Sequence, residues 1–158
     1  MTAEEVRQTI RDFVRMVDDD SGALLASEAR LHVLLDRIAL AVSENPVPFE
    51  ALDYEGGDRA DYDERRARVA ARFPDLGFYN TPASITQDIA DTSITVGDAI
   101  EDIVDIASEL SAVLKVWDAI GSEEAMRALA GAYQFHIGDH LRELQLYLHA
   151  RQRIPNPR

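Results

Sequence analysis

Cysteine is absent from this chain of 158 residues. Without thiolates the chain can form no disulfide, no cysteine-ligated zinc site and no cysteine nucleophile. Long apolar runs are missing too, since none approaches the roughly 20 residues that a membrane-spanning helix needs. The acidic first segment, MTAEEVRQTIRDFVRMVDDD, does not fit a secretory signal peptide. These absences lead us to expect a cytoplasmic protein.

Basic residues are scarce relative to acidic ones. The chain has 16 Lys plus Arg against 29 Asp plus Glu, for a formal net charge of −13. Such a charge repels nucleic-acid phosphates and anionic lipid headgroups, so we expect neither nucleic acid nor a membrane surface as a partner. Apolar residues make up 46% of the chain, which suffices for the core of one domain over residues 1–158.

The apolar residues recur at helical spacings of three and four along most of the chain. The first set is Val6, Ile10, Phe13 and Val17, and it follows the capping-box pair Thr2 and Glu5. No segment alternates apolar and polar residues well enough to predict a strand. Helices are predicted up to about residue 17, then over 23–43, 58–73, from 91–93 to 120, and over 123–151 with Ser122 as its N-cap.

The predicted fold class is therefore all-α. We expect one single-domain helical bundle of four longer helices plus one or two short helices. Loops are predicted around 45–60 and 74–82. The aromatic residues Phe78 and Tyr79 in the second loop are expected to be buried against the bundle.

Four acidic residues lie on one stripe of the predicted helix that ends near residue 120. Asp98, Asp102, Asp105 and Glu109 follow one another at spacings of four, three and four. Their oxygens could bind a divalent cation, since hard ions prefer carboxylate ligands. On a helical wheel, however, the stripe lies off the centre of the apolar stripe. The alternative interpretation is an acidic face exposed to solvent.

Two histidines in the last predicted helix form the other candidate. His136 and His140 are four residues apart, a spacing that lets both rings bind one zinc, nickel or ferrous ion. Asp102 and Asp105 are the candidate further ligands, provided that the two long helices pack antiparallel in a suitable register. The alternative is that the histidines are ordinary residues at the edge of the core with hydrogen-bond partners.

Gly138 lies between these histidines, although glycine costs a helix about 1 kcal/mol relative to alanine. It indicates either a close approach of a neighbouring helix or loop, or room for a ligand beside His136 and His140. Known catalytic motifs are incomplete. Ile137 follows His136, which excludes the His-Glu-x-x-His zinc motif, and no histidine completes the Glu-x-x-His pair of di-iron bundles.

Four segments in order resemble a known family. They are SEARLHVLLDRIALAV, RVAARFPDLGFYN, VGDAIEDIVDIASEL and EEAMRALAGAYQFHIGDHLRELQLYLH. Together they resemble the landmarks of a bacterial helical family, domain of unknown function 5063, over about residues 27–150. Ile137 stands where that family has tryptophan, and Asp139 where it has arginine. The resemblance implies a helical fold, but it supplies no catalytic residue and no cofactor.

Two hypotheses about function remain open. The first is a cytoplasmic binding or interaction module without catalysis, which could self-associate as a homodimer. The second is a metal-dependent hydrolase or metal-binding protein that uses His136 and His140 with Asp102 and Asp105. In the second case the histidines would anchor the ion, and a carboxylate would position or deprotonate a water molecule.

Overall fold

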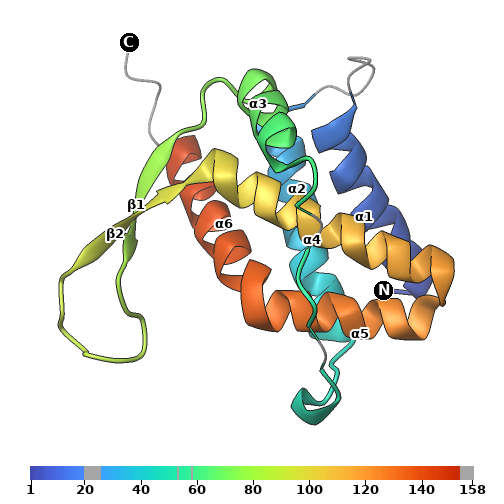
Figure 1. Ribbon diagram of the computed structural model, residues 1–158. Coiled ribbons are helices and arrows are strands. Elements are labelled where there is room, and N and C mark those ends of the chain that lie inside the picture. Colours follow the sequence, from blue (N-terminus) through green and yellow to red (C-terminus); the bar gives the residue numbers. More distant parts are fainter. Residues whose placement is uncertain (20–25, 53, 58, 154–158) are drawn as a thin grey trace.

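The computed structural model describes residues 1–19, 26–52, 54–57 and 59–153, and it is predominantly helical (Figure 1). The helical fold class is confirmed. Among the described residues, none of the helices combines the length and the apolar character needed to cross a membrane. In chain order the elements are α1 (Ala3–Asp18), α2 (Glu28–Glu44), a 3-10 turn η1 (Phe49–Ala51), α3 (Tyr62–Arg72), β1 (Phe78–Pro82), β2 (Ile94–Asp98), α4 (Ala99–Ala119), α5 (Ser122–Ala132), a π-helical turn η2 (Tyr133–Ile137) and α6 (Gly138–Arg153).

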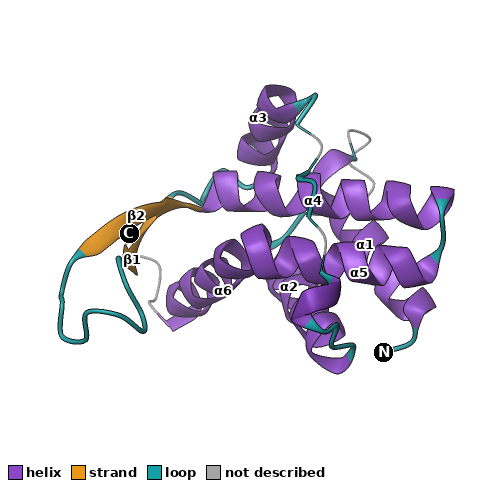
Figure 2. Cartoon of the chain, turned by 60° about the horizontal axis from the view of Figure 1, so that its bottom comes forward, coloured by secondary structure: helices purple, strands orange, loops and turns teal. Residues whose placement is uncertain are grey.

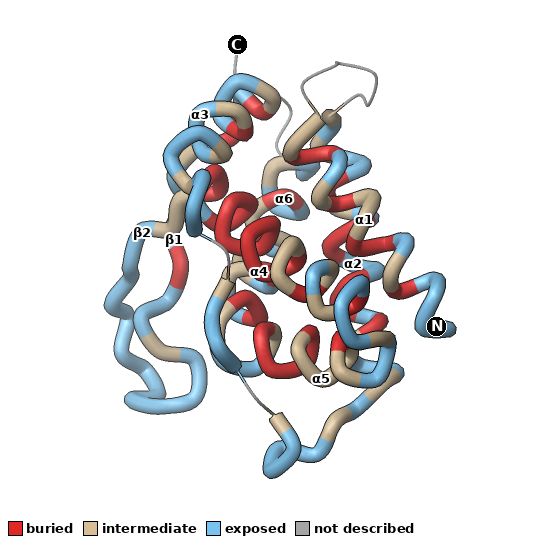
Figure 3. Tube along the Cα trace, turned by 45° about the vertical axis from the view of Figure 1, so that its right-hand side comes forward, coloured by how far each residue is buried: buried red, intermediate tan, exposed pale blue. Residues whose placement is uncertain are grey.

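Helix α4 is the centre of the molecule. It packs against α1, α3, α5 and α6, and it is buried along most of its length (Figure 3). The apolar stripe predicted for the first helix is confirmed, since Val6, Ile10, Phe13 and Val17 are all buried. Burial of these side chains together with those of α4 supplies the main driving force for folding.

Helix α1 begins where the sequence predicted. The capping box is confirmed: the hydroxyl of Thr2 accepts from the backbone of Glu5, and the carboxylate of Glu5 accepts from the backbone of Thr2. The next helix was predicted to begin at residue 23, and part of that start lies outside the described residues. The structure begins α2 at Glu28, because the hydroxyl of Ser27 caps it by accepting from the backbone of Arg30.

The predicted starts of the later helices are wrong by a few residues. The long helix does not begin at residues 91–93 but at Ala99, because the carboxylate of Asp98 accepts the backbone N–H groups of its first turn. The next helix was given Ser122 as its N-cap. The N-cap is Gly121, whose φ of 137° suits glycine, and Ser122 is the first helical residue.

A β-hairpin projects from the helices, so the expectation that the chain has no strand is wrong (Figure 2). Strands β1 and β2 pair antiparallel, with Phe78 opposite Asp98. Successive side chains of a strand point to opposite faces. Tyr79 therefore turns toward α6 and is half-buried, whereas Phe78, which was expected to be buried, is 73% exposed. Most apolar residues of these strands face solvent, so the strands have no buried apolar face that the sequence pattern could have revealed.

The last predicted helix is interrupted by the π-turn η2 between α5 and α6. This turn explains Gly138. A Cβ atom added there would lie 2.4 Å from the backbone carbonyl oxygen of Tyr133. The glycine is therefore required by a close approach of its own chain and not by a neighbouring helix. The π-turn also contains His136, and α6 carries His140 one turn later.

Candidate metal centre

The acidic stripe is buried, so its interpretation as a solvent-exposed face is wrong. Asp102, Asp105 and Glu109 are 3%, 6% and 3% exposed. The helical wheel placed the stripe beside the apolar stripe correctly. It could not show that α4 is covered on this side as well, by η2 and α6. Asp98 does not join the cluster, because it caps α4 and pairs with Arg66 at 2.8 Å.

Each histidine is held by one of these buried carboxylates. Nδ1 of His136 lies 2.7 Å from Oε1 of Glu109, and Nδ1 of His140 lies 2.8 Å from Oδ1 of Asp102. A carboxylate at Nδ1 keeps the proton on that nitrogen, so in the neutral ring Nε2 is left with a free lone pair. The two rings lie edge to face, with centroids 5.2 Å apart.

Two tyrosines from outside the helices complete these contacts. The hydroxyl of Tyr54 donates to Oε1 of Glu109 at 2.7 Å, and the hydroxyl of Tyr79 donates to Oδ2 of Asp102 at 2.5 Å. Tyr54 belongs to the segment between η1 and α3, and Tyr79 to β1. The fold thus builds two tyrosine–carboxylate–histidine chains from four separate parts of the sequence.

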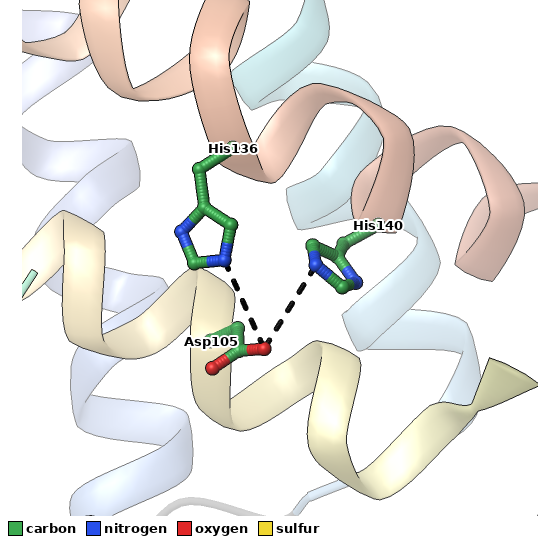
Figure 4. Close-up of side chains that lie close together, drawn as sticks. All are labelled: Asp105, His136 and His140. Carbon is green, nitrogen blue, oxygen red and sulfur yellow. Dashed lines mark ion pairs between the residues drawn. The ribbon is translucent and has the colours of Figure 1, made fainter. Parts of the chain in front are cut away.

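The two Nε2 atoms face one carboxylate oxygen (Figure 4). Oδ2 of Asp105 lies 4.0 Å from Nε2 of His136 and 3.8 Å from Nε2 of His140. One ligand atom from each of the three residues falls within 4.8 Å of the other two. The two long helices therefore do bring His136 and His140 to the acidic stripe, which was the condition set for a metal site.

The other oxygen of Asp105 is buried and accepts no hydrogen bond from the described part of the chain. An ion pair reaches it from Arg59, whose Nη2 is 3.7 Å away. The segment that carries Tyr54 and Arg59 lies close over the centre. A Cβ atom added to Gly57 would meet Cδ of Glu109 at 2.9 Å. Arg59 therefore compensates this buried oxygen in part, while Oδ2 of the same carboxylate faces the histidines.

The surroundings of the centre raise the pKa values of one histidine and three tyrosines. The hydrogen bond to Asp102 raises the pKa of His140, against the opposing effect of burial. Burial and the hydrogen bond to Glu109 raise the pKa of Tyr54 to about 12. Burial and the charge of Asp105 raise the pKa of Tyr62 to about 12. Burial and the hydrogen bond to Asp102 also raise the pKa of Tyr79. All three phenols therefore keep their protons at neutral pH.

The donor set and its surroundings fit a metal ion. Metal-bound histidines commonly donate their other N–H group to a carboxylate, as His136 and His140 do here. For an ion about 2.1 Å from each ligand in tetrahedral geometry, the ligand atoms must lie roughly 3.4 Å apart. The separations of 3.8 and 4.0 Å between Asp105 and the histidines need only a small closure to reach that value.

The sequence identified most of this cluster. All four candidates, His136, His140, Asp102 and Asp105, lie together. Asp102, however, is placed to orient His140 and not to face the point between the Nε2 atoms. Glu109 was in the predicted stripe but was not chosen as a candidate. Tyr54 and Arg59 were missed, since nothing in a loop sequence indicates which helix face the loop will cover.

Comparison with known proteins identifies a family and a fold for this chain. The sequence profile of domain of unknown function 5063 matches residues 2–152. The chain belongs to this family. The match includes α1, which lies before the region of about 27–150 where the resemblance was recognised in the sequence. No curated protein matches this DUF5063 chain.

A solved structure shows the same fold. The chain is similar to the crystal structure of protein BF1032 from Bacteroides fragilis, with a TM-score of 0.62 and 16% sequence identity. The similarity covers 98% of this DUF5063 chain and 94% of the other protein. At this identity the likeness extends to the fold alone.

Proposed function

We propose that this DUF5063 protein binds a divalent transition-metal ion through Nε2 of His136, Nε2 of His140 and the carboxylate of Asp105. One observation carries the proposal. Both Nε2 atoms face the same oxygen of Asp105, while both Nδ1 atoms are held by buried carboxylates. Two histidines that merely filled the edge of the core would not need to converge in this way.

Charge supports a divalent cation. Three carboxylates, from Asp102, Asp105 and Glu109, are nearly fully buried within reach of two histidines and Arg59. A metal ion binds neutral imidazoles, and with both rings neutral the cluster carries a net charge of −2, from three carboxylates and one guanidinium. Buried charges of one sign are costly unless they are compensated. A divalent ion balances this charge, and imidazole ligands favour zinc, iron or nickel over magnesium or calcium.

Three protein ligands leave at least one coordination position for water or a small molecule. Structural zinc sites are usually closed by four protein ligands, whereas catalytic sites keep a position open. An open site of this kind lowers the pKa of a bound water molecule and supports hydrolysis. Hydrolysis is therefore the reaction class that we propose for the site. The role of Asp102 and Glu109 would be to orient the histidines.

Elemental analysis and metal titration test the proposal directly. Protein purified without a histidine tag should contain, or take up from zinc, manganese or ferrous solutions, about one ion per chain. His136→Ala and His140→Ala should abolish saturable binding. His149→Ala is the matched control, because His149 is exposed on α6 and lies outside the cluster. Wild-type protein without saturable binding, or equal loss in all three variants, would rule the site out.

The hairpin favours a second candidate, the interaction module. Phe78, Ile94 and Val96 are 73%, 62% and 68% exposed and share its outer face. An apolar face that projects from the helices suits a protein partner or a second copy of the chain. Light scattering at several protein concentrations tests self-association. A homodimer that Phe78→Ser converts to a monomer supports this candidate, and a monomeric wild type counts against self-association.

A further inference from the structure

A cavity of about 440 Å³ opens beside the candidate metal centre, between α4, α5 and the segment after η1. Its walls are mainly apolar and include Val113 and Val116 of α4 and Ala128 of α5. Its volume falls in the range of pockets that bind small organic molecules. Tyr54 and Glu109 also line it, so the cavity adjoins the carboxylate that holds His136.

The charged residues of the cavity are mostly acidic. Glu55, Glu109 and Glu124 line it together with one basic residue, Arg127, which gives a net charge of −2. The guanidinium of Arg127 is already paired, since its Nη1 lies 2.8 Å from Glu124 and its Nη2 contacts Glu123. The whole chain, at −13, adds a field of the same sign. An anionic ligand is therefore disfavoured in this cavity.

Glu109 can accept a further hydrogen bond. In the described structure both bonds to its carboxylate, from Tyr54 and His136, fall on Oε1. Oε2 accepts no hydrogen bond from the described residues, and Glu109 is one of the residues that line the cavity. An ammonium group has three N–H donors and a positive charge, which gives strong hydrogen bonds to carboxylates.

We propose that this cavity binds an amphipathic organic amine. Its apolar body lies against Val113, Val116 and Ala128, and its ammonium group meets the carboxylates of Glu109 and Glu55. The apolar walls supply affinity, and the acidic lining selects an amine over an alcohol or an acid. The proposal does not rest on the metal ion, because the lining residues and their charges are the same without it.

Three probes that share one apolar body test this selectivity. They are 4-phenylbutylamine, 4-phenylbutan-1-ol and 4-phenylbutyrate, each titrated calorimetrically into the full chain at pH 7 with EDTA present. We expect the amine to bind about tenfold more tightly than the alcohol, a ratio that corresponds to about 1.4 kcal/mol. The acid should bind more weakly than the alcohol. Equal affinities, a preference for the acid, or no saturable binding of any probe would overturn the proposal.

A cavity-filling variant tests the location. Ala112 lines the cavity and is half-buried, so Ala112→Phe should fill it and weaken amine binding at least tenfold. Ala71→Phe is the control, because Ala71 is exposed on α3 and lies outside the lining. Amine binding that survives in folded Ala112→Phe would place the ligand elsewhere and refute the site. Should that variant not fold, the three-probe series on the wild type still decides the selectivity.

The outcome is separable from that of the metal site. Zinc titration of Ala112→Phe should still show saturable binding, since none of the proposed ligands His136, His140 and Asp105 lines the cavity. Loss of amine binding with metal binding retained separates the two sites. Metal binding without amine selectivity refutes only this inference, and amine selectivity without metal binding refutes only the proposed metal site.

Discussion

At the scale of single residues, the centre depends on how two imidazole rings are oriented. The side chains of His136 and His140 are 24% and 31% exposed, but their Nδ1 atoms reach carboxylates that are almost fully buried on α4. The orientation of each ring is therefore set from the inside of the molecule. In the proposed site Asp105 is a ligand, whereas Asp102 and Glu109 are positioning residues.

The positioning carboxylates should affect metal affinity without abolishing it. We expect Asp102→Asn and Glu109→Gln each to raise the Kd for zinc about 10- to 100-fold, because loss of such a partner weakens the orientation of the histidine. Asp105→Asn should raise the Kd for zinc more than either of these variants, because Asp105 is a proposed ligand. Calorimetric titration measures the three values. The same Kd for wild type and both positioning variants would show that the histidine–carboxylate contacts do not serve a metal site.

The raised pKa of His140 predicts how the stability of the metal-free protein depends on pH. The folded protein holds this proton more tightly than the unfolded chain, whose histidine has its ordinary pKa of about 6.5. The stabilisation is therefore complete below about pH 6.5 and is lost as the pH rises through the folded pKa. The charged groups that raise this pKa are Asp102, Asp105 and Glu143.

Urea unfolding in EDTA between pH 6 and pH 9 measures this dependence. The free energy of unfolding of wild type should fall over that range. In Asp102→Asn the free energy of unfolding should fall less over this range, because the variant lacks the hydrogen bond that contributes most to the raised pKa of His140. A wild-type stability that rises with pH over the same range would contradict the assignment.

At the scale of elements, the π-turn fixes the relative position of the two histidines. It places the carbonyl oxygen of Tyr133 where the side chain of residue 138 would otherwise lie. A π-turn inserts one residue into a helix and often occurs at a functional site. Gly138 is thus a requirement of the turn that presents His136 to α4.

Gly138→Ala should therefore disturb both stability and metal binding. The added methyl group meets backbone and cannot be relieved by a side-chain rotation, so we expect a loss of about 1–3 kcal/mol in the free energy of unfolding. The Kd for zinc should rise as well. Gly77→Ala is the control, since a Cβ atom there meets nothing within 4 Å. Chemical denaturation and zinc titration of both variants compare the two effects.

The elements also show why the sequence predicted some features and not others. The stripe of α1 was predictable because one face is buried and the other is exposed, so Val6 and Phe13 recur at helical spacing. The hairpin was not, since its outer strand residues, such as Val96, are exposed and gave no burial pattern. The depth of Asp105 also could not be predicted, because the burial of α4 on that side depends on where α6 packs.

At the scale of the whole molecule, α4 serves two purposes at once. One face of it belongs to the hydrophobic core, and the adjacent face presents Asp102, Asp105 and Glu109 to η2 and α6. The proposed ion would join α4 to η2 and α6, which follow it in the chain after α5. A ligand that binds only the folded chain stabilises the whole fold.

Metal binding should therefore raise the melting temperature of the protein. At a free zinc concentration of 100 times Kd, the gain is about 2.7 kcal/mol. For a chain of this size, each kcal/mol raises Tm by roughly 2–4 °C, so the expected shift is on the order of 5–10 °C. Thermal unfolding with EDTA and with zinc measures it. His149→Ala should show the wild-type shift, and His140→Ala should show none. An equal shift in both variants would mean that the stabilising ion binds somewhere other than between α4 and α6.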